Sequence, residues 1–537
     1  MSQPLHRLPL RQTAEGERIE TRPAYVEEWL DSLPYMDFDK TVRLLHQATE
    51  ATNRQPLKPA ERLELVELYS RPYQFYLDSR IRSGMQHSLQ SIETLQAQID
   101  VMKGIAINLA YGSRLGAEAT LTKKTLWRKS RPPIEAMLLS MTYLSHALVF
   151  SFQEYAVTPR NIWRELHFIY DFAENLGQEN TTLTMPVGDA VHRRTSIAKA
   201  YKRIALTAMA DPHHLPFGAI WEVYEQLYDW ADYAALSRYS DVQDPAGRFV
   251  INLDSDTPPL PCNKFRTSAA SDRHRLLDAT ELNRHLEKLV TATDRQRQDD
   301  LVLSPYYARL ILDHVASAWN LPPQRRVPRK AESGRVQLAC GFNATYFFNN
   351  NESEFRPPAA AESGEIILGE TRVPAQVDIT PEANHHVDTW DILDRGAGGY
   401  ALTTRDKPRA AVRTGDLVVL RPENAEPDKQ AAWSTGIIRW LMVRRNGIYR
   451  IGIEIIAGSA TAAAIRALSG SVQDRQFRRA LLIVGKSGEP AVLTGKGLHI
   501  ADRELEIDTA ADRRRYRAGE LRESTLSFEY FLLQQAE

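Results

Sequence analysis

Apolar residues recur three and four positions apart from residue 24 to about residue 320, a spacing that places them on one face of an α-helix. Proline and glycine interrupt this pattern at intervals, as they do between helices. The pattern predicts an all-helical region over residues 24–320, which can divide into two subdomains near residue 180 or within 240–275. The predicted helical segments are 41–52, 59–78, 85–110, 132–156, 159–176, 193–210, 218–236, 279–296 and 303–319.

Two stretches do not follow the helical pattern. Residues 1–23 mix charged residues with scattered leucines, and we expect this N-terminus to be disordered. Residues 240–271 contain a cluster of prolines and are expected to form a long loop or a pair of short strands.

The period of the apolar positions falls toward two after a proline-rich basic linker at residues 321–334. A period of two is typical of β-strands, and the spacing of the segments is that of a barrel. We predict a barrel over 335–470, closed by a short helix at 460–468, and a second small β-module, or an extension of the first, over 471–537. The predicted strands are 335–348, 366–372, 387–393, 399–404, 416–421, 434–444, 448–456, 478–484, 489–494, 504–508 and 525–533. The expected fold class is therefore α + β and multidomain, with an all-α region before an antiparallel barrel and a strand-rich tail.

One helical pattern occurs twice. The sequence Trp-x2-Leu-x3-Tyr begins at Trp163, and Trp-x2-Tyr-x3-Tyr begins at Trp221. The first resembles the opening helix of a tetratricopeptide repeat, although the later part of that pattern and its period of about 34 residues are absent. Two copies of a divergent helical hairpin would produce this pattern, and so would two unrelated amphipathic helices.

Composition narrows the functional class. The 67 Lys and Arg residues nearly cancel the 68 Asp and Glu residues, so the net charge gives no reason to expect binding to nucleic acid or to an anionic membrane. The two cysteines form no CxxC pair and fit a reduced compartment. The most apolar stretch, 136–152, is shorter than the roughly 20 residues that span a bilayer and is predicted to be a buried core helix. We expect a cytoplasmic protein without membrane insertion.

Two short motifs lie at distinctive places in the β-rich region. Arg325-x3-Arg329 precedes the first predicted strand, and Asp394-Arg-Gly-Ala-Gly-Gly399 lies between two later strands. They resemble the RxxxR and D/NxSxxG motifs of PilZ domains, which are receptors for cyclic di-GMP. The strand pair that begins at Gly436 and Gly452 is similar to the late strands of that family. The resemblance covers roughly residues 325–470.

The resemblance implies a cyclic di-GMP site and no cofactor or metal. Arg325 and Arg329 would bind phosphate and guanine through their planar guanidinium groups, and Arg326 offers a second basic register. Asp394 would accept hydrogen bonds from a guanine edge. Gly396, which stands where the family has serine, and Gly399 would permit positive φ and close backbone approach. The helical region would then transmit nucleotide binding to an unidentified protein partner.

Both motifs are also compatible with a purely structural role. A basic stretch is typical of a solvated linker, and Asp394 to Gly399 is also an ordinary hairpin turn. The chain would then be a scaffold or adaptor with a degenerate PilZ-like barrel, or would contain an unrelated barrel. We find no catalytic motif in residues 100–320 and expect no enzymatic activity. The His385-His386 pair and the basic run 513–517 are predicted to be a solvated loop and a solvated turn.

Overall fold

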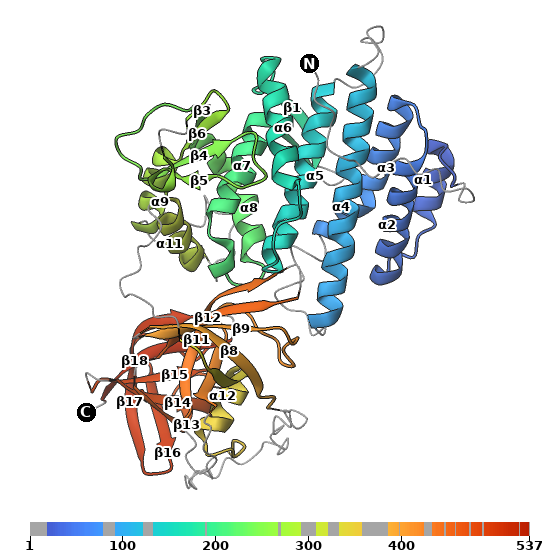
Figure 1. Ribbon diagram of the computed structural model, residues 1–537. Helices are drawn as coiled ribbons and strands as arrows, with labels where there is room; N and C mark the ends of the chain where they lie inside the picture. Colours follow the sequence, from blue (N-terminus) through green and yellow to red (C-terminus); the bar gives the residue numbers. More distant parts are fainter. Residues whose placement is uncertain are drawn as a thin grey trace. The chain divides into compact units, whose positions relative to one another are not determined.

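The chain divides into two compact units, Met1–Gln324 and Arg325–Glu537, the first mainly helical and the second mainly β (Figure 1). The computed structural model describes residues 19–78, 92–121, 133–187, 191–266, 270–291, 308–320, 332–356, 385–396, 398–423, 432–444, 447–456, 458–471, 474–485, 488–525 and 527–535. Most of the predicted disordered N-terminus and most of the predicted linker lie outside these residues. The expected order, a helical N-terminal region followed by antiparallel barrels, is confirmed.

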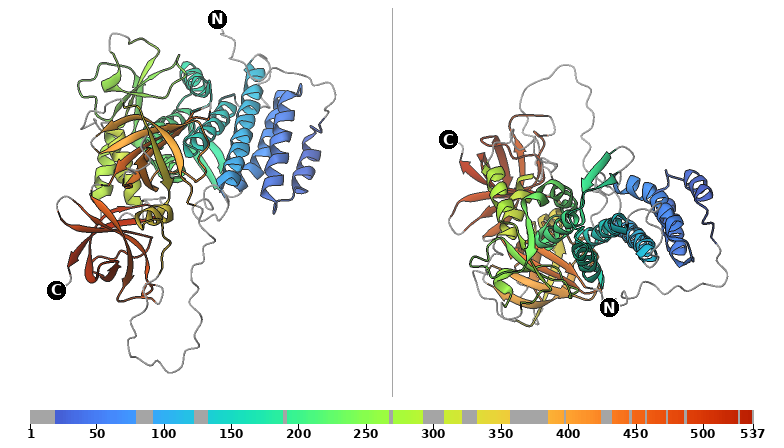
Figure 2. Two further views of the ribbon diagram at one scale, coloured as in Figure 1. Left: turned by 60° about the horizontal axis from the view of Figure 1, so that its bottom comes forward. Right: turned by 90° about the horizontal axis from the view of Figure 1, so that it is seen from above.

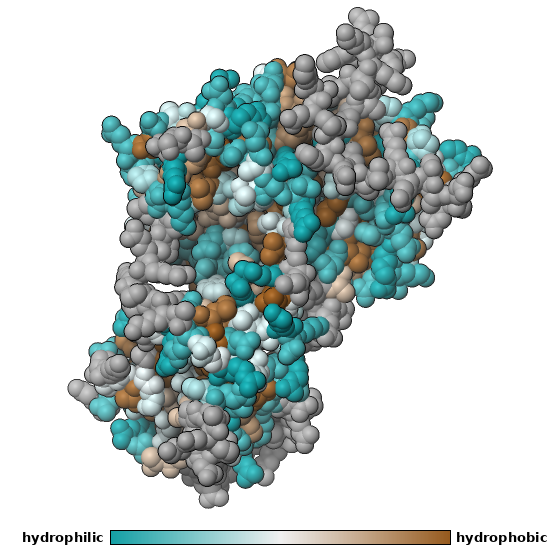
Figure 3. Space-filling model, in the orientation of Figure 1, coloured by the Kyte–Doolittle hydropathy of each residue, from teal (hydrophilic) through white to brown (hydrophobic). Residues whose placement is uncertain are grey.

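The helices of the first unit pack against helices that are near them in the chain (Figures 1 and 2). They are α1 (Pro23–Asp31), α2 (Phe38–Arg54), α3 (Pro59–Tyr76), α4 (Ile92–Leu121), α5 (Pro133–Gln153), α6 (Ile162–Asn175), α7 (Ile197–Met209), α8 (Ala219–Trp230), α9 (Thr280–Thr291) and α11 (Ala308–Trp319). Helix α1 packs on α3, α2 and α3 pack on α4, and α4 packs on α5. Residues at the N-termini determine where two of these helices begin. Asp37 caps α2 by accepting from the Lys40 amide, and Pro59 begins α3. Hydrophilic residues cover most of the visible surface of this unit (Figure 3).

Helix α5 is the central element of the helical unit. Among the described residues it is the one helix long and apolar enough to cross a membrane, but 89% of its most apolar window is buried inside the protein. This burial confirms the predicted core helix. Helices α6 and α8, which carry the repeated pattern, both contact α5 and α7. Trp163 and Trp221 are both buried there, as either interpretation of the repeat predicts.

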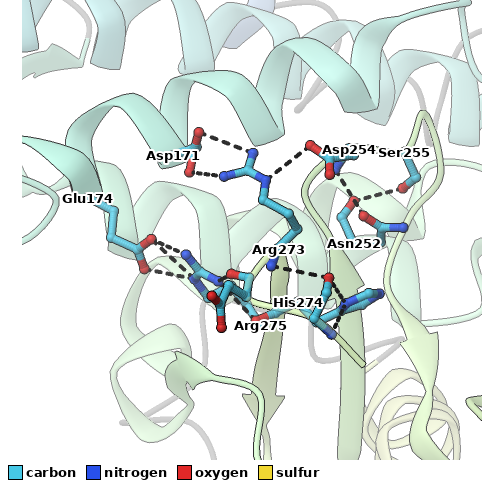
Figure 4. Close-up of polar contacts among 10 residues, drawn as sticks. Asp171, Glu174, Asn252, Asp254, Ser255, Arg273, His274 and Arg275 are labelled. Carbon is cyan, nitrogen blue, oxygen red and sulfur yellow. Dashed lines mark hydrogen bonds and ion pairs between the residues drawn. The ribbon is translucent and has the colours of Figure 1, made fainter. Parts of the chain in front are cut away.

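Two small sheets interrupt the helical unit. Strands β1 (Leu183–Val187) and β2 (Val191–Thr195) form an antiparallel hairpin. A second antiparallel sheet has the order β3-β6-β4-β5, and its β4 and β5 confirm the pair of short strands expected within 240–271. These strands are β3 (Ala235–Arg238), β4 (Arg248–Asn252), β5 (Leu260–Pro261) and β6 (His274–Asp278). Ion pairs join α6 to β6 and its preceding turn: Asp171 bonds Arg273, and Glu174 bonds Arg275 (Figure 4).

The second unit consists of two closed antiparallel barrels. The first has the strand order β10-β11-β12-β9-β8-β7, and the second has the order β13-β14-β15-β18-β17-β16. The first contains β7 (Arg335–Cys340), α12 (Phe342–Asn349), β8 (Asp388–Gly396), β9 (Gly399–Thr404), β10 (Leu417–Pro422), β11 (Ser434–Val443) and β12 (Tyr449–Ile455). The second contains β13 (Ser459–Ala467), β14 (Arg478–Val484), β15 (Pro490–Thr494), β16 (Glu504–Thr509), β17 (Arg513–Ser524) and β18 (Glu529–Gln535).

Three predictions in this unit are wrong. The helix expected at 460–468 is strand β13, because pairing with both β14 and β16 outweighs the high helix propensity of its alanines. Strand β13 therefore belongs to the second barrel, and β12 is the last strand of the first barrel along the chain. The strand expected at 335–348 divides into β7 and α12. The basic run 513–517 begins β17, where Tyr516 is buried between exposed arginines. The strand expected at 366–372 lies outside the described residues.

Candidate functional site

The hairpin between β8 and β9 carries the second sequence motif. Asp394 follows a bulge in β8, where the register shifts between Ile392 and Asp394. Gly396 ends β8 and pairs with Gly399, which begins β9. The hairpin turn expected from the Asp and Gly residues is therefore present, and it places the half-buried Asp394 near the end of its strand.

Asp394 begins a lateral row across four strands of the first barrel. It is opposite Ala401 in β9, Ala401 is opposite Gly452 in β12, and Gly452 is opposite Trp440 in β11. Leu402, the next position in β9, is completely buried, whereas Asp391 in β8 and Glu454 in β12, on the same side as the row, are exposed. Because side chains alternate between the two faces of a strand, the row faces outward. It combines a carboxylate, two small residues and an indole.

Glycine is required at two positions of this face. A Cβ atom on Gly452 would lie 1.9 Å from Nε1 of Trp440, so the indole rests directly on the β12 backbone. A Cβ atom on Gly399 would lie 2.0 Å from the carbonyl oxygen of Ile453. Gly399 does not have the positive φ expected from its sequence. Its missing side chain instead lets β9 approach β12 closely.

A second outward row lies beside the first. Arg335, Asp391, Thr403 and Arg450 are opposite one another in β7, β8, β9 and β12. Arg335 pairs with Glu423 at 2.8 Å. The buried Nε of Arg450 has no hydrogen-bond partner within the described part of the chain. The outer face thus offers acceptors, a guanidinium nitrogen and an aromatic surface, which suit a planar, phosphorylated ligand.

The predicted basic residues Arg325, Arg326 and Arg329 lie outside the described residues. The chain is described again from Glu332, whose carboxylate is 3.4 Å from Arg395 of the hairpin. Two residues after Glu332, the Gly334 carbonyl accepts a hydrogen bond from the Ile392 amide of β8. The segment that follows the basic motif therefore runs along β8 beside the hairpin.

Sequence reasoning had indicated Trp440 and Gly452 only as parts of a strand pair, and it missed Ala401 and Arg450. Ala401 and Arg450 carry no motif, and only the register between distant strands brings them beside Asp394. His385 hydrogen-bonds Glu354 at 2.8 Å and stacks on Phe347. Among the described residues there is no group of three His, Cys, Asp or Glu side chains that could hold a metal ion.

A pocket in the helical unit contains three cations near Tyr224 and Tyr228. Arg193 and Arg203 both bond Glu225, at 3.2 and 2.8 Å, and Lys199 bonds Asp232 at 2.6 Å. Because each cation already has a carboxylate partner, this cluster is best interpreted as a structural network.

Two families of known proteins match successive parts of the chain. The family described as the N-terminal domain of the cyclic-di-GMP receptor FimW matches residues 24–242. The family described as the middle PilZ domain of the same receptor matches residues 248–366 and 365–462. The chain contains a PilZ domain. The PilZ match begins in β4 and ends within β13, so the PilZ domain lies in the middle of the chain. The sequence had placed the resemblance further toward the C-terminus, at roughly residues 325–470.

The similarity extends beyond the PilZ domain. The chain is 22% identical to the cyclic-di-GMP receptor FimW of Pseudomonas aeruginosa, over 96% of this chain and 91% of that protein. The Asp394 hairpin and the row that ends at Trp440 both belong to the matched PilZ residues. Most of the second barrel lies beyond them.

Proposed function

We propose that this protein is a cyclic di-GMP receptor that binds the nucleotide at the β8–β9 hairpin, on the outer face of its PilZ barrel. The observation that carries the proposal is the outward row from Asp394 to Trp440 within the PilZ match. The similarity to a protein named as a cyclic-di-GMP receptor, along nearly the whole chain, supports the same function.

Each group on this face has a chemical task in the proposal. The Asp394 carboxylate accepts from the N–H groups of a guanine edge, and the flat Trp440 ring offers a stacking surface. Arg325, Arg326 and Arg329 supply guanidinium groups for phosphate and guanine. Glu332, near Arg395, is three residues after Arg329. Three residues span at most roughly 11 Å, so chain connectivity keeps Arg329 within reach of the hairpin.

The position of the basic motif supports a switch. Arg325 is the first residue of the second unit, so the motif lies where the helical unit joins the barrels. Charge-assisted contacts between these arginines and the nucleotide would hold this segment against β8. The nucleotide would thereby change the connection between the helical unit and the barrels. We propose that this change controls the binding of a protein partner by the helical unit. The protein would act in the cytoplasm and without catalysis.

Isothermal titration of the full-length protein with cyclic di-GMP tests the proposal. We expect saturable binding that is weakened at least about tenfold by Arg325→Ala, Arg329→Ala or Asp394→Ala, because each removes a charge-assisted hydrogen bond. Asp508→Asn, a carboxylate of the second barrel, is the matched control and should bind normally. Equal binding by all variants would place the site elsewhere.

One observation favours a second candidate. Gly396 replaces the serine of the PilZ motif and removes one hydroxyl from the ligand site. If the wild-type protein takes up no cyclic di-GMP, the barrel is degenerate and the chain is a scaffold that works through its helical unit alone.

A further inference from the structure

The two barrels of the second unit have the same strand connectivity. When the strands of each barrel are counted in chain order, the first pairs with the second and the fourth, and the sixth pairs with the third and the fifth. The remaining pairs, second with third and fourth with fifth, also coincide. All pairs in both barrels are antiparallel. The second barrel therefore repeats the topology of the PilZ barrel, although most of it lies outside the PilZ match.

The shared topology makes equivalent faces comparable. In the first barrel, the outer face of the second, third and sixth strands carries Asp391, Asp394, Thr403, Arg450 and Glu454. This is the face of the candidate site, and it is polar.

The same face of the second barrel is apolar. Two rows cross its strands: Ala462, Leu481, Leu493 and Tyr530 form one, and Ala460, Ile483, Ala491 and Leu532 form the other. Val492 and Phe531, at alternate positions, fill the barrel interior. Apart from the Tyr530 hydroxyl, the side chains of these two rows carry no polar group for a guanine edge, and none of them carries a charge for a phosphate.

The first barrel covers this apolar face. The rows form one hydrophobic cluster with Leu417 of β10, Ile437 of β11 and Tyr346 of α12. Polar contacts border the cluster: Arg479 donates to Asn343 of α12 at 2.6 Å, and Ser527 donates to Asp416 at 3.3 Å. Leu481 and Leu493 are completely buried as a result.

We propose that the second barrel is a non-binding copy of the PilZ topology, and that it docks onto the first barrel through the counterpart of the ligand face. The docking surface consists of the two apolar rows, and its partner is the β10, β11 and α12 side of the first barrel. The chain then has one nucleotide-binding face rather than two. This last clause rests on the proposed function, whereas the docking itself does not.

Cysteine labelling of the full-length protein tests the docking. Ala491→Cys places a thiol on the apolar rows, where Ala491 is 3% exposed, and Val484→Cys is the matched control in the same barrel, at a position that is 43% exposed. Peptide mass spectrometry after maleimide treatment separates these thiols from the native Cys262 and Cys340. We expect Val484→Cys to react with maleimide in the folded protein. Ala491→Cys should remain unlabelled until denaturant is added. Equal labelling of both thiols would overturn the docking.

Nucleotide binding tests the proposal that the second barrel does not bind cyclic di-GMP. Asp394→Ala should weaken all cyclic di-GMP binding at least about tenfold if the first barrel holds the only site. Binding that keeps its wild-type affinity in Asp394→Ala, with slower hydrogen exchange at β14 and β15, would overturn the non-binding assignment and leave the receptor function intact. If the wild-type protein does not bind the nucleotide, the proposed function fails, and the labelling result still decides the docking surface.

Discussion

The guanidinium of Arg439 forms a two-point ion pair with the carboxylate of Glu523, with Nη1–Oε1 and Nη2–Oε2 distances of 2.5 and 2.9 Å. Arg439 lies at the bulge of β11 next to Trp440, and Glu523 belongs to β17 of the second barrel. The Nε of Arg439 also donates at 2.6 Å to Glu454, which is opposite Gly399 in the sheet. One side chain therefore connects the candidate ligand face with the second barrel.

Glu523→Gln should loosen the connection between the barrels. The substitution removes one charge of a partly exposed pair, and we expect it to cost about 1 kcal/mol. Hydrogen exchange should accelerate in both β11 and β17. Glu506→Gln, whose carboxylate pairs with Arg466 within the second barrel, is the control and should affect that barrel alone. The same exchange pattern in both variants would argue against a connection through Arg439.

Gly399→Ala should damage the first barrel. The added methyl group would lie 2.0 Å from the Ile453 carbonyl oxygen, and a strand backbone cannot move away without breaking its pairing. We expect a loss of about 3 kcal/mol, seen as a lower Tm, together with weaker nucleotide binding. Gly398→Ala places its methyl group in open space and should be nearly neutral. Equal Tm values for the two variants would contradict the close approach of β9 and β12.

Asp416 should make the junction between the barrels pH-dependent. Burial raises the pKa of Asp416 to about 6, against opposing effects of Arg413 and of the hydrogen bond from Ser527. An unfolded aspartate has a pKa of about 4, so the folded protein holds this proton more tightly. The resulting stabilisation is complete below about pH 4 and is lost as the pH rises through 6.

Asp416→Asn should remove that dependence. Hydrogen exchange of β10 peptides in the full-length protein, followed from pH 4 to 7 after correction for intrinsic exchange rates, measures it. The wild-type protein should lose protection as the pH rises, and the variant should lose less. Identical pH profiles would show that Asp416 does not titrate in this range.

Glu174 and Arg275 should contribute strongly to the helical unit. Burial by itself would raise the pKa of Glu174, but the hydrogen bonds from Arg275 outweigh it and lower the pKa (Figure 4). The stabilisation is present above the usual carboxylate pKa and is lost as the pH falls through the lowered value. Arg275 is only 3% exposed, so Glu174→Gln should cost about 3 kcal/mol in denaturant unfolding followed by far-UV circular dichroism.

The matched control for this ion pair is Asp254→Asn. Asp254 pairs with Arg273 at the surface, where the two side chains are 63% and 39% exposed. Exposed pairs contribute little, so this change should cost less than about 1 kcal/mol. Equal losses in the two variants would show that burial does not distinguish the pairs.

The sequence by itself determined those helices and strands in which the spacing of apolar residues matches the faces that are buried. The predicted strands 399–404 and 478–484 are β9 and β14, because a short apolar run bounded by turn residues is typical of a strand that is buried on both faces. The repeated aromatic pattern predicted buried faces on α6 and α8, because residues three and four positions apart lie on one face of a helix. The Asp and Gly residues at the end of β8 likewise determined the turn between Gly396 and Gly399.

Only the tertiary structure decided what depends on pairing between distant segments. The alanine-rich β13 is a strand because β14 and β16 complete its hydrogen bonds, and no local preference records those partners. The same reason applies to the site: Asp394 meets Ala401, Gly452 and Trp440 through the register of four strands, and that register is set by closure of the barrel. The common connectivity of the two barrels was equally hidden, because strand order is a property of the closed sheet and leaves no periodic mark on the chain.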